Sequence, residues 1–288
     1  MMTAIRTFIK QHAALIYYAL VFAISWGGVL IVVGPAGLPG TKAQYDALLP
    51  AAILAMLAGP SLAGLLLTSL VYEKAGLRDF LARLLRWRVG ARWYAVALLT
   101  APLLMLALLI LLSMRSTAFL PGLFAVKAKA AHVLFGLTVG LVAGLFEELG
   151  WTGFAIPAIR RRYGVLTTGL IVGLLWAAWH LLVAFWASGT VSGPLALLSY
   201  LLDPILFLTA YRVLMVWVYD RTESLFLAML MHMSLTASAR IIIPLAIVGA
   251  SLLTFDLLWF IVLWAVVAVV VVTNHGQLMQ PPLSRQAV

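Results

Sequence analysis

The sequence predicts an all-α fold, a polytopic bundle of about eight transmembrane helices with one amphipathic helix in the membrane interface. Of the 288 residues 65% are hydrophobic and only 10% are charged, whereas a soluble domain carries about 25% charged residues. The mean hydropathy is +1.11. Apolar runs of about 17–25 residues, the length that crosses a bilayer, recur along the whole chain. These observations predict an integral membrane protein whose first partner is lipid.

The expected spans follow one another with short connections. They cover residues 13–34, 48–72, 93–114, 132–157, 165–187, 193–219, 224–247 and 250–273. The first run is too long for the apolar region of a signal peptide and has no clear cleavage site, so it is read as a span. Pro60 predicts a kink in the second run. No internal repeat is evident, and residues 1–288 are expected to form a single integral-membrane domain.

The amphipathic helix is expected between the second and third spans, in "GLRDFLARLLRWRVGARW". Apolar residues recur at helical spacing on one face: Leu77, Phe80, Leu81, Leu84 and Leu85. Charged residues take the other face: Arg78, Asp79, Arg83 and Arg86. This pattern is typical of a helix that lies in the plane of the interface.

The basic residues predict the orientation. Loops on the side of the N-terminus carry fourteen of the 19 Lys and Arg residues. Because basic loops stay in the cytoplasm, both termini are expected to be cytoplasmic. The same rule accounts for the net charge of +10, so no nucleic-acid partner is expected. The absence of cysteine excludes disulfides and thiolate metal sites.

Few ionisable residues lie within the expected spans: Glu147, Glu148, His180, Asp203, Arg212, His232, Arg240 and Asp256. Such residues are costly in a bilayer and therefore indicate function. Arg212, Arg240 and Asp256 lie near span ends, where their side chains are expected to reach the interface. Asp203 precedes a proline and is expected to mark a helix break.

The remaining candidates are two carboxylates and two imidazoles. Glu148 continues a row of small residues formed by Gly136, Gly140 and Gly144, which lets another helix approach closely. Trp176 lies one turn before His180 in "WAAWH". His232 and Thr236 share a helix face in "HMSLT".

These residue types allow several chemistries. A general base, an acid and oxyanion donors could be drawn from them. Glu147, His180 and His232 are also the kinds of ligand that a catalytic zinc site uses. A buried polar network that only specifies helix packing is the structural alternative. A proton-coupled transporter is a further alternative, although it usually shows two repeated halves.

The three motifs resemble those of the CPBP intramembrane proteases, which include the CAAX prenyl proteases and bacterial Abi proteins. The family pattern is EExxxR, then an aromatic residue three positions before a histidine, then HxxxN. This chain has "EELGWT" at 147–152, "WAAWH" at 176–180 and "HMSLT" at 232–236. The resemblance covers residues 130–240, which it implies are the catalytic core.

Two positions depart from the family pattern, because Thr152 replaces its arginine and Thr236 its asparagine. Without the arginine, the glutamates are expected to lack a nearby cation, so that one retains a proton. Thr236 keeps a hydroxyl that can still reach an oxyanion. A metal-free site is favoured over zinc, because the lost residues weaken support for tight coordination.

The resemblance implies an endopeptidase that cleaves a membrane-associated protein or peptide with a Glu-activated water. Glu147 and Glu148 would handle the proton, and His180, His232 and Thr236 would stabilise the oxyanion. A bacterial cell membrane is the expected location. The alternative is a non-catalytic scaffold or bacteriocin-immunity protein that keeps the family fold.

Overall fold

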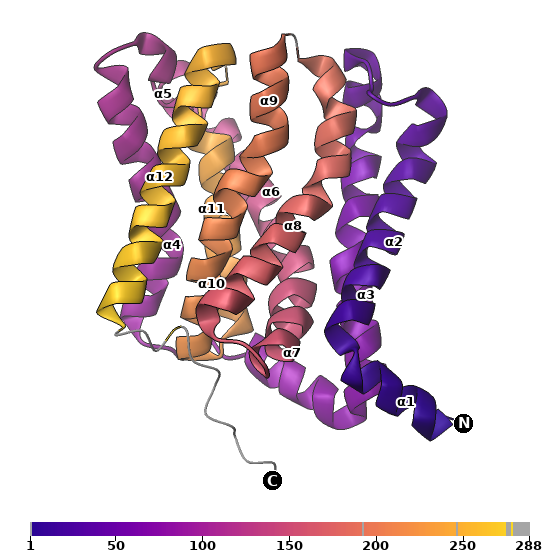
Figure 1. The fold of residues 1–288 in the computed structure, drawn as a ribbon. Coiled ribbons are helices and arrows are strands. Elements are labelled where there is room, and N and C mark those ends of the chain that lie inside the picture. Colours follow the sequence, from indigo (N-terminus) through magenta and orange to yellow (C-terminus); the bar gives the residue numbers. More distant parts are fainter. Residues whose placement is uncertain (1, 192, 246, 275–277, 279–288) are drawn as a thin grey trace.

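The computed structural model describes residues 2–191, 193–245, 247–274 and 278. All regular elements in this part of the chain are helical, and eight helices are long and apolar enough to cross a membrane. They run side by side as a bundle (Figure 1). The predicted fold class is confirmed, and the protein is an integral membrane protein.

The spans occur in the predicted order. The first four transmembrane helices are α2 (Ala13–Val33), α3 (Lys42–Leu84), α4 (Ala91–Ser113) and α6 (Lys129–Gly150). The last four are α8 (Val165–Ala187), α10 (Thr209–Thr222), α11 (Leu225–Ile242) and α12 (Gly249–Thr273). The span that contains α10 begins at Tyr200, within the helix before it. Short helices join them: α1 (Met2–Gln11), α5 (Gly122–Ala125), α7 (Ile156–Arg160) and α9 (Pro194–Asp203). Three single turns of 3₁₀-helix lie in the loops: η1 (Gly34–Ala36), η2 (Thr117–Phe119) and η4 (Ser188–Thr190).

The helix α3 is broken at Glu73, a position separate from the kink predicted at Pro60. Glu73 has φ 53° and ψ −147°, while Pro60 keeps helical dihedral angles. The residues after Glu73 run across the lower end of the bundle, where α1 also lies (Figure 1). This segment is the predicted amphipathic helix. Its Phe80 is buried against Leu225 and Met229, so its apolar face also packs on protein.

Two helices contain a π-helical turn. The turn η3 (Trp151–Ala155) joins α6 to α7, and η5 (Pro204–Leu208) joins α9 to α10. The expected helix break at Asp203 is therefore a change of helix type at Pro204, and the side chain of Asp203 lies outside the described residues. π-Helical turns are rare in proteins, and those that occur are often found at functional sites.

The helix α10 lies inside the bundle. Six consecutive residues, 211–216, are buried, which covers every side of the helix. It packs mainly against α8, while α11 packs against α6 and α4. Side chains at the middle of α10 are therefore covered by protein on all sides.

Candidate active site

Glycines bring α11 against the end of α6 that carries the two glutamates. A Cβ atom added to Gly140 would lie 2.5 Å from the Met233 carbonyl oxygen, and one added to Gly144 would lie 2.6 Å from that of Met229. Only glycine allows this close approach of the two backbones. It places His232 of α11 beside Glu148 of α6. Both side chains are buried, with exposed fractions of 2% and 0%.

Glu148 accepts hydrogen bonds from three side chains. Arg212 Nη1 lies 2.9 Å from its Oε1 and 2.8 Å from its Oε2. His232 Nδ1 lies 2.7 Å from Oε1. The Thr152 hydroxyl donates to Oε2. We call Glu147, Glu148 and His232 the Glu–His cluster.

The prediction that Arg212 reaches the interface is wrong. Its exposed fraction is 0%, and it forms an ion pair with Glu148. Arg212 was placed near a span end, but α10 continues to Thr222. The backbone of Arg212 therefore lies about 15 Å from that end of the helix, too far for the side chain to leave the bundle. The expectation that the glutamates lack a nearby cation is also wrong, because Arg212 supplies that cation to Glu148.

Glu147 presents its two oxygens to different partners. Oε2 accepts hydrogen bonds from Trp176 Nε1 at 2.6 Å and from Trp151 Nε1 at 3.3 Å. Oε1 faces His232 Nε2 at 3.9 Å, a distance too long for a hydrogen bond. One carboxylate oxygen is therefore held by two indoles, while the other faces the imidazole.

The π-turn η3 supports both glutamates. Trp151 and Thr152 follow Glu147 and Glu148 by four residues each, and each donates to the glutamate one turn before it. Residues 151–156 are all buried. Trp151 also packs on Tyr17 and Tyr18 of α2, with ring centroids 5.7 Å apart in both pairs. The turn therefore holds the two donors between the glutamates and α2.

His180 lies beside the Glu–His cluster but makes no direct contact with its carboxylates in the described structure. Its Nδ1 lies 2.9 Å from the Trp176 carbonyl oxygen. The Trp176 ring separates the two histidines, with centroids 5.8 Å from His180 and 5.0 Å from His232. Because a carbonyl only accepts, His180 Nδ1 carries a proton, and Nε2 can donate only when the ring is charged.

The three candidate zinc ligands are not arranged as a metal site. Within the described residues, no group of three His, Asp or Glu side chains lies close enough to hold an ion. His232 Nδ1 and Glu147 Oε2 are engaged by Glu148 and by the indoles, which leaves His232 Nε2 and Glu147 Oε1 as their remaining ligand atoms. Glu147, His180 and His232 therefore do not converge on one point in the described structure.

The other candidates differ in burial. Thr236 is half-buried one turn after His232, and its hydroxyl makes no hydrogen bond to the described part of the chain. Arg240 is exposed near the end of α11, as predicted. Asp256 is 4% exposed, so its expected place at the interface is wrong. This part of α12 is covered because α12 packs against α9 and η5.

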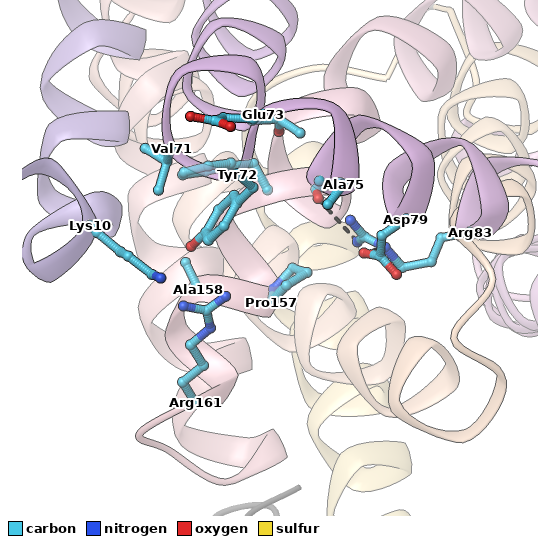
Figure 2. Close-up of a pocket in the computed structure, with 14 residues that line it drawn as sticks. Lys10, Val71, Tyr72, Glu73, Ala75, Asp79, Arg83, Pro157, Ala158 and Arg161 are labelled. Atoms are coloured by element: carbon cyan, nitrogen blue, oxygen red, sulfur yellow. Dashed lines mark hydrogen bonds and ion pairs between the residues drawn. The ribbon is translucent and has the colours of Figure 1, made fainter. Parts of the chain in front are cut away.

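A cavity of about 480 Å³ lies beside η3, between α1, α3 and α7 (Figure 2). Gly153 and Phe154 of η3 line it, as do Lys10 and Arg161. The Arg161 guanidinium lies 5.1 Å from the centre of the Tyr72 ring. The cavity is at the end of the bundle that carries α1 and does not contain the Glu–His cluster.

The segment that carries these residues is similar in sequence to known proteins. Residues 129–238 match the family described as Type II CAAX prenyl endopeptidase Rce1-like. Over 114 residues the chain is 32% identical to a protein named CAAX prenyl protease 2 from Methanococcus maripaludis. This segment is similar to the CPBP family. The CPBP match covers 38% of this chain and 41% of the relative's length.

The CPBP segment contains all five residues that the sequence singled out: Glu147, Glu148, His180, His232 and Thr236. It also contains three side chains whose roles the sequence did not reveal: Trp151, Trp176 and Arg212. For Trp151, the spacing of four residues from Glu147 was an available signal. For Arg212, the signal was a charge with apolar residues on both sides in "AYRVLMVWV".

Proposed function

We propose that this protein is an intramembrane endopeptidase of the CAAX prenyl protease type, in which Glu147 activates the attacking water. The observation that carries the proposal is the 3.9 Å separation of Glu147 Oε1 and His232 Nε2. A water that is about 2.8 Å from both atoms fits this separation, because hydrogen bonds of that length meet at the water at roughly a right angle. The family match supports peptide hydrolysis as the reaction.

The proposed reaction begins with this water. Its oxygen attacks the carbonyl carbon of the scissile peptide, and Glu147 Oε1 takes one of its protons. The carbonyl oxygen becomes an oxyanion. When the carbon–nitrogen bond breaks, Glu147 returns the proton to the leaving amine. The indoles of Trp151 and Trp176 keep the carboxylate oriented throughout, because they hold its other oxygen.

His232 holds the water from the other side. Its Nδ1 is bonded to Glu148, so in the neutral ring Nδ1 carries the proton and Nε2 offers a lone pair to the water. Glu148 thus sets the tautomer of His232 and does not act on the substrate itself. The two neighbouring glutamates therefore have different proposed roles: Glu148 orients His232, and Glu147 transfers the proton.

Thr236 and His180 are the proposed donors to the oxyanion. The Thr236 hydroxyl has no other hydrogen bond in the described structure and lies one turn from His232. The Nδ1 proton of His180 is used by the Trp176 carbonyl, so His180 Nε2 becomes a donor only when the ring takes up a second proton. Oxyanion donors act by stabilising charge that develops only in the transition state.

The proposed substrate is a membrane-associated protein or peptide, and a prenylated C-terminus is the first to test, because the matched relative is named a CAAX prenyl protease. The location is proposed to be a bacterial cell membrane with both termini in the cytoplasm. The basic loops support this orientation, and burial of Arg212 removes only one cation from that side.

The test is cleavage of a fluorogenic peptide with a prenylated CAAX end, by protein reconstituted in liposomes. We expect cleavage that falls at least about 10²-fold in Glu147→Ala, since general base catalysis contributes on that order. His232→Ala is expected to fall similarly. The unprenylated peptide is the control for substrate class. Wild-type protein that cleaves neither peptide, or a Glu147→Ala variant with full activity, would overturn the proposal and favour a scaffold.

A further inference from the structure

Arg212 contacts the supports of both proposed catalytic groups. Its Nη1 donates to both oxygens of Glu148, which binds His232 Nδ1. Its guanidinium carbon also lies 4.0 Å from the centre of the Trp176 ring, whose indole nitrogen donates to Glu147. The distance is within the range of a cation–π contact. One buried cation therefore contacts the residue that holds Glu147 and the residue that holds His232.

We infer that Arg212 is the positioning residue of the site, a cation supplied by α10 that sets the separation of Glu147 and His232. The inference rests on the proposed function. Arginine suits this role because its planar group can stack on an indole and donate along its edge at the same time. Arg212 acts only through Trp176 and Glu148.

A purely structural role explains this arrangement poorly. Replacing a buried ion pair with apolar residues is often neutral or stabilising, because taking both charges out of water costs as much as their attraction gains. Arg212 Nε and Nη2 are buried without a hydrogen-bond partner in the described structure, so the bundle does not satisfy the whole guanidinium. A chain under selection for stability alone gains little from this residue.

Position 152 provides a way to move the cation. The Thr152 hydroxyl donates to Glu148 Oε2, one of the oxygens that Arg212 also contacts. An arginine at 152 would start one turn from Glu148 and could reach the same carboxylate. Residue 152 is fully buried, so there is room for the longer side chain only when residue 212 is shortened. This exchange restores the partner of Glu148 but leaves Trp176 without its cation.

The experiment compares wild type with Arg212→Met, Arg212→Lys and the exchange variant Arg212→Met/Thr152→Arg, on the prenylated fluorogenic peptide. We expect kcat to fall about 10²-fold in Arg212→Met, as a displacement of about 1 Å at a catalytic group can produce. KM should change less than about twofold, because Arg212 touches no substrate. Arg212→Lys should be intermediate. The exchange variant should regain about tenfold in kcat, and Thr152→Arg alone should gain nothing.

A second readout does not need activity. The chain has 5 histidines, and a His232→Gln variant identifies the signals of His232 in the nitrogen NMR spectrum of ¹⁵N-histidine-labelled protein. We expect His232 to be protonated at Nδ1 in wild type and to become a mixture of tautomers in Arg212→Met. In the exchange variant, we expect the Nδ1-protonated tautomer to predominate again. A merely structural arginine would not move these signals in a protein that stays folded.

Each result decides the inference. Wild-type kcat and His232 signals in Arg212→Met would overturn it, as would an exchange variant that regains thermal stability without kcat. If Arg212→Met does not fold, Arg212→Lys and the exchange variant decide in the same way. A fully active Glu147→Ala variant would instead overturn the proposed reaction, and the His232 signals would still report whether Arg212 sets the tautomer.

Discussion

Glu147 Oε1 and His232 Nε2 face each other at 3.9 Å inside the bundle, and each residue is held from its far side by a different partner. Indoles hold Glu147, and Glu148 holds His232. The two neighbouring glutamates therefore have different surroundings. Glu147 has one oxygen directed at the imidazole, whereas both oxygens of Glu148 are engaged by protein donors.

This difference predicts opposite effects of removing the two charges. Glu147→Gln should lower kcat about 10²–10⁴-fold with little change in thermal stability, because glutamine can still accept from both indoles. Glu148→Gln should lower the free energy of unfolding by about 3–5 kcal/mol, because Arg212 is left buried without its counter-charge. Thermal unfolding in detergent and cleavage of the prenylated peptide measure the two effects. Equal loss of stability in both variants would contradict the assignment.

The indole donors predict a graded loss of activity. Trp176→Phe removes a 2.6 Å hydrogen bond to Glu147 and Trp151→Phe a 3.3 Å one, so the first should lower kcat more. Hydrogen bonds to charged groups contribute about 1.5–3 kcal/mol, which corresponds to roughly 10–100-fold. Trp264→Phe is the matched control, since its Nε1 is buried without a partner in the described structure. Kinetics of the three variants check the order, and a control as impaired as Trp176→Phe would refute it.

Close packing of α6 on α11 predicts a loss of both stability and activity in Gly144→Ala. The new Cβ would meet the Met229 carbonyl oxygen at 2.6 Å and the Met233 nitrogen at 3.0 Å, so α11 must shift and carry His232 with it. Overpacking of this kind costs about 1–3 kcal/mol.

The control for this variant is Gly27→Ala in α2, where a Cβ would have nothing within 4 Å. We expect it to be as stable as wild type and as active. Denaturation of both variants, followed by the peptide assay, separates a local packing effect from a general intolerance of alanine. Unchanged stability in Gly144→Ala would show that the helices can separate without cost.

Metal removal is expected to leave cleavage intact. Glu147, His180 and His232 do not converge on one point in the described part of the chain. The check is the cleavage rate before and after treatment with a strong zinc chelator, with elemental analysis of the purified protein. Zinc near one atom per chain, lost together with activity, would reverse this prediction.

The sequence determined the membrane, the spans and the candidate residues, because each depends on local composition. A hydrophobic run of sufficient length must form a helix in lipid, where every backbone group needs an internal partner. Ionisable residues inside such runs were visible as exceptions for the same reason. Eight predicted spans correspond to the eight apolar helices, and the three motifs lie in the segment that matches the CPBP family.

Only the tertiary structure showed which partners each of those residues has. Arg212 is 64 positions from Glu148 in the sequence, and its distance from a helix end depends on how far α10 continues past it. No local pattern states which helix supplies a cation to a buried carboxylate. The Glu147 and Glu148 side chains point about 100° apart on one helix, so their neighbours come from different helices. Trp176 of α8 holds the first, and Arg212 of α10 with His232 of α11 holds the second.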